Sequence, residues 1–170
     1  MTGSYRYMVC AVALMVGWVS PAGAQQQEVP SYENATVQKG ACWRANLRRT
    51  GVYQTAGIPQ KPVLQWKFDT GGPVQSSPVE LDGVIYVGTD NDAFLALDAA
   101  TGEEKWRVEV EGGVQSSACV ADGRVFFGGR DRQVYGLDAA TGEVLWTTPA
   151  NRPVTTSPAV AYGIVFIEGD

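Results

Sequence analysis

Hydrophobic positions along the chain fall into short runs that alternate with clusters of turn-forming residues. Residues 84–88 (VIYVG) and 94–97 (FLAL) are continuous apolar runs, and runs of this length and composition are typical of buried β-strands. Residues 104–110 alternate instead, which predicts an outer strand that buries one face, made by Trp106, Val108 and Val110. Residues 74–81 predict an inner strand. Its polar start, Gln75-Ser76-Ser77, suits a position that lines a water-filled channel.

Turn chemistry connects these four strands. Asp82-Gly83 has the composition of a two-residue type I′ hairpin loop, in which both residues need a positive φ. Residues 89–92 form the next expected turn. In the third turn the side chains of Asp98 and Thr101 can bond nearby backbone amides, and Gly102 tolerates a positive φ.

The whole unit repeats at a spacing of 40 residues. Residues 71–110 and 111–150 match at 16 of 40 positions without a gap, and the run LDAATGE occurs in both. The same spacing separates three tryptophans and three serines, namely Trp66, Trp106 and Trp146, and Ser77, Ser117 and Ser157. A four-stranded sheet that repeats at this period is the signature of a β-propeller blade. The alternative, a β-solenoid, has shorter coils without four hairpin-linked strands.

The predicted fold class is all-β: a β-propeller of four-stranded antiparallel blades with 40-residue repeats, present as an incomplete N-terminal fragment of about 2.75 blades. Residues 71–110 form blade one, residues 111–150 blade two, and residues 151–170 half of blade three. Residues 63–69 (VLQWKFD) align with an outer strand through Trp66. We expect them to act as a latch strand that completes the last blade of a closed ring, and we expect the natural protein to continue on the same repeat.

The N-terminus predicts a secretory signal peptide over residues 1–24. Arg6 supplies a positive charge, residues 7–19 form an apolar stretch, and Ala24 ends the small-residue run that a signal peptidase accepts. The apolar stretch has 13 residues, fewer than the roughly 20 that a membrane-spanning helix needs. We therefore expect cleavage after Ala24, no membrane anchor, and a periplasmic or extracellular protein. Residues 25–62 follow as a leader segment.

Composition excludes several classes of site. The formal net charge is −5, and no basic cluster is longer than Arg48-Arg49, which argues against binding to nucleic acid. The sequence contains no histidine, so these residues build neither a Ser-His-Asp triad nor a histidine-ligated metal site. Without a histidine to activate them, the repeated serines are poor nucleophiles.

Two cysteines remain after the predicted cleavage, Cys42 and Cys119. An oxidising compartment permits a disulfide between them. The simpler interpretation is that Cys119 is a small core residue, because it takes the repeat position that Val79 and Ala159 fill. The sequence leaves the pairing open.

Residues 96–106 (ALDAATGEEKW) fit the pattern A-x-D-x-x-T-G-x-x-x-W, and residues 136–146 depart from it only where Gly136 replaces alanine. This pattern resembles the tryptophan-docking motif of quinoprotein-type, pyrroloquinoline-quinone-like β-propellers. Residues 43–51 also resemble the leader of secreted members. The resemblance implies a ring in which each tryptophan packs against the neighbouring blade, with structural docking residues at Trp66, Asp98, Thr101, Gly102, Trp106, Asp138, Thr141, Gly142 and Trp146.

The resembled family contains enzymes and non-enzymes, so the fold alone does not assign a function. Its enzymes hold the quinone with a disulfide of adjacent cysteines and a calcium ion, and this segment has no such cysteine pair. Its non-catalytic members include the propeller lipoprotein of the outer-membrane barrel-assembly machinery. We expect a non-catalytic binding or scaffold module with no cofactor in this segment, which presents a propeller face to a protein or small-molecule ligand. The alternative is the N-terminal part of a quinone- and calcium-dependent alcohol or sugar dehydrogenase.

The run Asp90-Asn91-Asp92 has the alternating oxygen donors of a calcium loop. It lacks the following glycine and the distal glutamate of such a loop. The next repeat places Arg130-Asp131-Arg132 at the same position. We therefore interpret both runs as hairpin turns of opposite charge, between which a weak interblade ion pair can form.

Overall fold

The computed structural model describes residues 10–13, 40–42, 47, 63–161 and 163–168. Every regular element in these ranges is a β-strand, and every strand pairing is antiparallel. The same ranges contain no helix that is long and apolar enough to cross a membrane. The predicted cleavage site after Ala24 and most of the leader motif of residues 43–51 lie outside the described residues.

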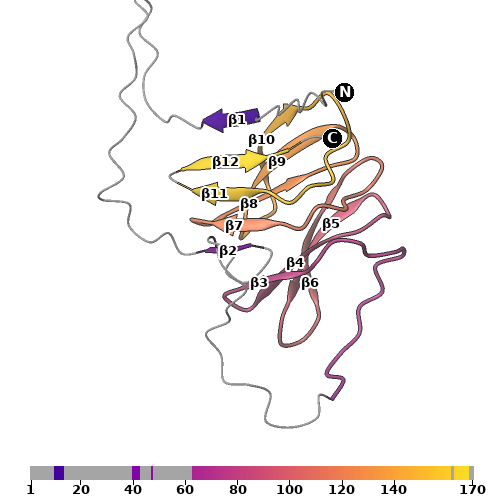
Figure 1. Cartoon of the computed structure of the whole chain (residues 1–170). Coiled ribbons are helices and arrows are strands. Elements are labelled where there is room, and N and C mark those ends of the chain that lie inside the picture. Colours follow the sequence, from indigo (N-terminus) through magenta and orange to yellow (C-terminus); the bar gives the residue numbers. More distant parts are fainter. Residues whose placement is uncertain (1–9, 14–39, 43–46, 48–62, 162, 169–170) are drawn as a thin grey trace, which may run out of the picture.

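Blades one and two have the predicted four-stranded order. Blade one consists of β3, β4, β5 and β6 in sequence order, which span Val79–Leu81, Val84–Gly88, Ala93–Asp98 and Glu104–Glu109. Blade two repeats it with β7, β8, β9 and β10, which span Cys119–Ala121, Arg124–Gly128, Gln133–Asp138 and Val144–Pro149. Figure 1 shows the two sheets stacked beside each other, blade one in magenta and pink and blade two in orange.

Two further strands come from the N-terminal part of the chain. β2 (Gly40–Cys42) pairs with β7 and becomes a fifth strand of the blade-two sheet. β1 (Cys10–Ala13), from within the predicted signal peptide, pairs with β12 (Ile164–Ile167), which itself pairs with β11 (Ala159–Ala161) (Figure 1). The sequence analysis predicted neither addition.

The turns have the backbone geometry that their sequences predict. Asp82 and Gly83 have φ values of 53° and 78°, and Asp122 and Gly123 have 50° and 72°, so both hairpin loops carry a positive φ at each central residue. These short loops hold the inner two strands of each blade in register.

The inner strand of blade one is shorter than predicted. Residues 74–78 are not part of a strand, and β3 begins only at Val79, after a proline that has no backbone N–H to donate. Ser76 is buried rather than exposed to a wet channel. Its hydroxyl donates to Gly88 O at 2.8 Å and accepts from Gly88 N at 2.9 Å, and so closes the end of β4. Ser116 makes the same pair of bonds to Gly128.

The strand expected over residues 63–69 is also not formed, since residues 63–70 carry no regular structure. No described strand pairs with this segment, and Val63 and Leu64 are exposed. Trp66 and Phe68 nevertheless pack against the apolar face of β4 and β5, at Val87, Leu95 and Leu97. Trp66 thus takes the register position expected for it, while the pairing of residues 63–69 with a last blade, and with it the latch role, stays a prediction.

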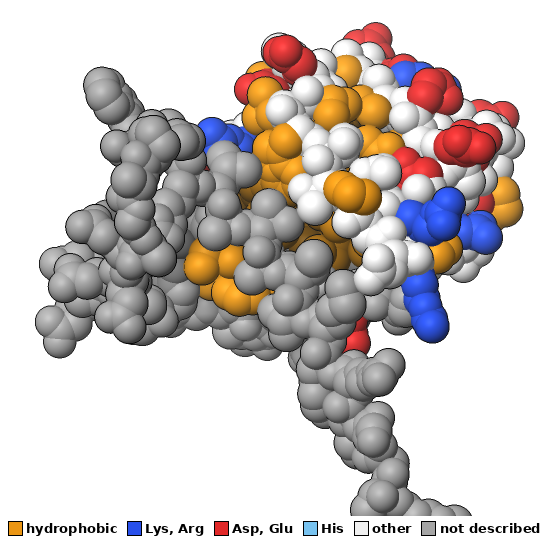
Figure 2. All heavy atoms as spheres, turned by 90° about the horizontal axis from the view of Figure 1, so that it is seen from above, with side chains coloured by type: hydrophobic (Ala, Val, Ile, Leu, Met, Phe, Trp, Pro, Cys, Tyr) orange, Lys and Arg blue, Asp and Glu red, His pale blue; other side chains and the backbone are white. Residues whose placement is uncertain are grey.

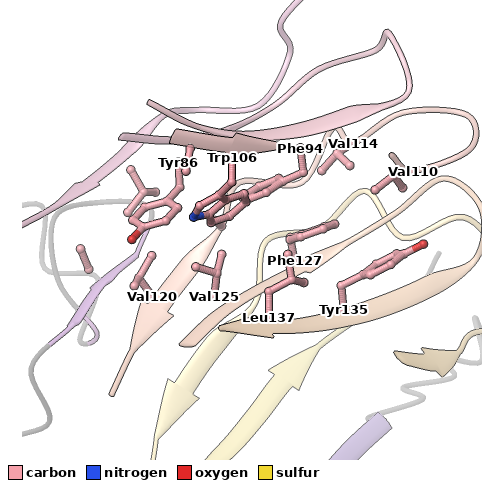
Figure 3. Packing of buried hydrophobic residues seen from close by; sticks show 14 residues of the cluster. Tyr86, Phe94, Trp106, Val110, Val114, Val120, Val125, Phe127, Tyr135 and Leu137 are labelled. Atoms are coloured by element: carbon pink, nitrogen blue, oxygen red, sulfur yellow. The ribbon is translucent and has the colours of Figure 1, made fainter. Parts of the chain in front are cut away.

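The main hydrophobic core fills the seam between blade one and blade two. Phe94 and Phe127 stack with their ring centroids 4.0 Å apart, and both are fully buried. Figure 3 shows Tyr86, Phe94 and Trp106 of one sheet facing residues of the other across this seam. Because one blade supplies each half of the core, neither sheet buries its apolar face alone.

Candidate functional site

The repeated tryptophans lie on the turn of the following blade. Trp66 Nε1 donates to Ala99 O at 3.0 Å, and Trp106 Nε1 donates to Ala139 O at 3.1 Å. A Cβ added to Gly102 would stand 2.5 Å from the Trp66 ring. Each indole therefore needs a glycine beneath it, and the docking geometry implied by the family resemblance is present at both turns.

The third tryptophan departs from this arrangement. Trp146 Nε1 is buried but has no hydrogen-bond partner among the described residues. Its ring packs against Phe126, with the centroids 6.0 Å apart. A Cβ on Gly136, its cross-strand neighbour, would lie 2.2 Å from the ring, which explains why glycine replaces the alanine of the motif at this position.

The aspartate turns are engaged with their own backbone. Asp98 Oδ1 accepts from the amides of Ala100 and Thr101, both at 3.0 Å, and Gly102 has a φ of +77°. Backbone hydrogen bonds from Thr101 and Ala100, with a smaller contribution from Lys105, hold the pKa of the Asp98 carboxyl below its usual value.

Asp138 repeats the bonds to the backbone. Amide and hydroxyl hydrogen bonds from Thr141 are the main cause that lowers the pKa of its carboxyl. Gly142 again has a positive φ, of +76°. The polar residues of both motif copies thus stabilise their own turns.

A chain of serines crosses the blades near the inner strands. Ser77 N donates to Ser117 Oγ at 2.9 Å, and Ser117 N donates to Ser157 Oγ at 3.0 Å. Each bond joins residues 40 positions apart. The repetition of these serines was recognised from the sequence, but the hydrogen bond that each hydroxyl accepts from the preceding blade was not predicted. The 40-residue spacing was the signal that could have indicated this bond.

Two turns of opposite charge lie at equivalent positions of blades one and two. In the first, Gln75 Nε2 donates to Asp90 Oδ2, while Asp90 Oδ1 is buried without a partner among the described residues. In the second, Asp131 accepts from Tyr135 OH at 2.5 Å and from Gln133 N at 3.0 Å. Burial, and then the Asp131 carboxylate, raise the pKa of the Tyr135 hydroxyl.

The expected ion pair between these turns is not formed in the described part of the chain. The bridges found there are Lys105 to Asp98 and Arg107 to Glu104, both within blade one. Arg130 and Arg132 remain exposed on the second turn. Asp131, which lies between them, is turned inward onto Tyr135.

Within the described ranges no three cysteine, aspartate or glutamate side chains converge as a metal site would require. The cysteines are at positions 10, 42 and 119 and are nowhere adjacent.

Comparison with known proteins extends this picture. A family model described as outer membrane protein assembly factor BamB matches residues 35–170, more than half of the chain. A europium-containing methanol dehydrogenase of known structure is 23% identical, with a TM-score of 0.54 over 62% of this chain and 22% of that protein. Among proteins with curated functions the search found no relative.

Two further solved structures are similar over shorter stretches. A quinohemoprotein alcohol dehydrogenase from Pseudomonas putida is 27% identical, with a TM-score of 0.49 over 60% of this chain and 17% of that protein. BamB from Moraxella catarrhalis is 24% identical, with a TM-score of 0.46 over 51% of this chain and 27% of that protein. This chain spans less than a third of each. The matches confirm the predicted pyrroloquinoline-quinone-like repeat family and the all-β propeller fold.

Proposed function

This chain belongs to the family described as outer membrane protein assembly factor BamB, and on that premise we propose that it is a non-catalytic binding or scaffold module. We further propose that the signal peptide exports it to the periplasm or the cell exterior. There it presents one propeller face to a protein partner or a small-molecule ligand. The competing proposal is the N-terminal part of a quinone-dependent dehydrogenase.

The observation that carries the proposal is the division of labour between repeated and variable positions. Two of the three repeated tryptophans, both motif aspartates and the repeated serines bond to backbone groups of this chain. The turns 89–92 and 129–132 differ in charge between the blades, and their exposed residues are Asn91, Asp92, Arg130 and Arg132. Rigid scaffolds that carry variable loops bind partners through those loops.

The charge of these turns favours a protein over a polyanion as the partner. Asp90-Asn91-Asp92 is acidic, and its counterpart in blade two carries Arg130 and Arg132. Most basic side chains in Figure 2 gather in one group, apart from most of the acidic ones. A surface that carries both positive and negative charge repels part of any uniformly charged polymer. A protein partner can instead present one acidic and one basic patch that complement the two turns.

Two measurements on the full-length mature protein test the proposal. Incubation with pyrroloquinoline quinone and calcium should give no dye-linked dehydrogenase activity and no stoichiometric quinone binding. Affinity capture from an envelope extract should retain a partner that Arg130→Glu with Arg132→Glu loses. Arg124→Glu, at the opposite end of β8, is the charge-matched control and should keep it. Quinone-dependent turnover would favour the dehydrogenase. Equal loss of the partner in both variants would place the partner site elsewhere.

A further inference from the structure

The leader of the chain contributes a strand to the inner side of blade two. β2 runs antiparallel to β7, with Gly40 opposite Ala121 and Cys42 opposite Cys119. β7 is the first and innermost strand of its blade, as β3 is of blade one. β2 also contacts β3, so it lies where the inner strands of two consecutive blades meet (Figure 1).

The strand is inserted into the core rather than laid on the surface. Ala41 belongs to the core cluster of the seam between the blades, together with Val79 and Val120. Cys42 packs in the second cluster, next to Phe126. A Cβ on Gly40 would stand 2.3 Å from Val120 O, so only glycine permits this approach of the two backbones.

A disulfide joins Cys42 to Cys119 across this pairing, and the interpretation of Cys119 as only a small core residue is therefore wrong. The sequence could not decide this, because the pairing depends on a strand register that joins residues 77 positions apart. Packing alone does not explain why residue 119 is a cysteine, since Val79 and Ala159 fill the same repeat position without a sulfur atom. Both cysteines are buried.

We propose that this disulfide is a redox-dependent clasp that holds the leader strand on blade two. β2 has only three residues, and its few hydrogen bonds barely offset the entropy of ordering them. A disulfide that closes a loop of this length lowers the conformational entropy of the state in which β2 is detached from β7. It thereby stabilises the paired state. In an oxidising compartment the clasp is closed and the inner edge of β7 is covered.

Reduction opens the clasp by thiol–disulfide exchange. A dithiol reductant gives two electrons and two protons to the Cys42–Cys119 bond, which becomes two thiols, and the reductant becomes a disulfide. β2 then leaves β7, whose inner edge exposes unpaired backbone groups. The four strands of blade two remain, because their own turns and seam contacts do not involve Cys42.

The test is amide hydrogen exchange on the full-length mature protein, oxidised and after reduction with dithiothreitol. Exchange at residues 40–42, and at those amides of residues 119–121 that point toward β2, should accelerate roughly a hundredfold on reduction, which is the scale of the stabilisation by a disulfide that closes a long loop. Residues 84–88 of blade one serve as the internal reference and should not change. Alkylation with mass spectrometry follows Cys42 and Cys119: neither should be alkylated before reduction and both after it.

Cys119→Val and Cys42→Ala supply the matched variants. The valine is the residue of the same position in blade one, so it keeps the packing and removes only the bond. Both single variants and the double variant should exchange like the reduced protein, and dithiothreitol should have no further effect on the double variant. Unchanged protection of residues 40–42 after reduction would overturn the proposal. So would equal acceleration at residues 84–88, which would mean that the bond supports the whole fold. Free thiols at Cys42 and Cys119 in the freshly secreted protein would overturn it as well.

Discussion

Blade one and blade two share their strand order, turns and docking contacts, yet their outer strands meet solvent in different ways. β6 carries Lys105 and Arg107, which pair with Asp98 and Glu104 at 3.4 Å and 2.6 Å. β10 instead exposes Val144 and Leu145 and has no charged residue. Charges on an outer edge discourage pairing with another strand, and β10 lacks this protection.

The turns and the buried serines of the same two blades show the opposite relation. Ser76 and Ser116, Gly102 and Gly142, and Asp98 and Asp138 make the same bonds in both copies. Identity between repeats therefore marks positions that hold the ring together. Differences between them mark the surface, where a role can vary from blade to blade. The predictions below test that division, from the largest expected effect to the smallest.

The largest effect is expected from Trp106→Ala in the full-length protein. The indole is 9% exposed and packs beside Tyr86 and Phe94, so its removal should lower the free energy of unfolding by roughly 3–5 kcal/mol. Urea unfolding followed by circular dichroism measures it. Val144→Ala, on the exposed face of β10, should change stability by less than about 0.5 kcal/mol. A loss below about 1 kcal/mol at Trp106 would reopen the ligand-stacking interpretation.

A second substitution separates the two reasons for glycine at a docking turn. Gly142→Ala combines a positive φ with a Cβ that would lie 2.7 Å from the Trp106 ring, and should destabilise by about 2–4 kcal/mol. Gly83→Ala has a φ of +78° but nothing within 4 Å, so it reports the backbone strain alone and should cost about 1–2 kcal/mol. Equal losses in thermal unfolding at the two positions would show that indole docking places no demand on the turn.

The serine chain predicts a smaller and local effect. Ser117→Ala leaves the Ser77 amide without its acceptor and should cost about 1–2 kcal/mol. Thr147→Ala removes a hydroxyl from an exposed position of β10 and should be nearly neutral. Hydrogen exchange at the Ser77 amide should accelerate in the first variant only; an unchanged rate would mean that this amide is protected by other means.

The smallest effect concerns the two motif carboxylates at low pH. Their folded-state pKa values lie below the usual aspartate value, so they stabilise the fold above about pH 4, and this contribution disappears as the pH falls through the folded pKa. Lys105 contributes to the shift at Asp98 but has no counterpart at Asp138. Added salt should therefore raise the pKa of Asp98 more than that of Asp138, as NMR titration of the carboxyl carbons would show. Equal responses would exclude the lysine as a cause.

Local chemistry was predictable from the sequence and pairing over long distances was not. The Asp82-Gly83 turn and the extent of β4 follow from neighbouring residues, and both were predicted correctly. Residues 63–69 carry no regular structure because a strand needs a partner, and the last blade that they were expected to complete is not among the described residues; Trp66 needs only the turn beneath it. Ser76 was misassigned because polarity alone does not distinguish a channel wall from a buried hydroxyl that closes a strand end.

The serine chain gives the propeller a property that belongs to the repeat and to no individual blade. Every bond in it runs from an amide of one unit to a hydroxyl of the next, between residues of the same type. A unit of 40 residues inserted between two others, or deleted from between them, leaves each remaining junction with the same donor and acceptor. Duplication or deletion of a repeat in the gene can therefore change the length of such an array without requiring a new hydrogen bond between blades. The serine chain by itself places no limit on the number of blades.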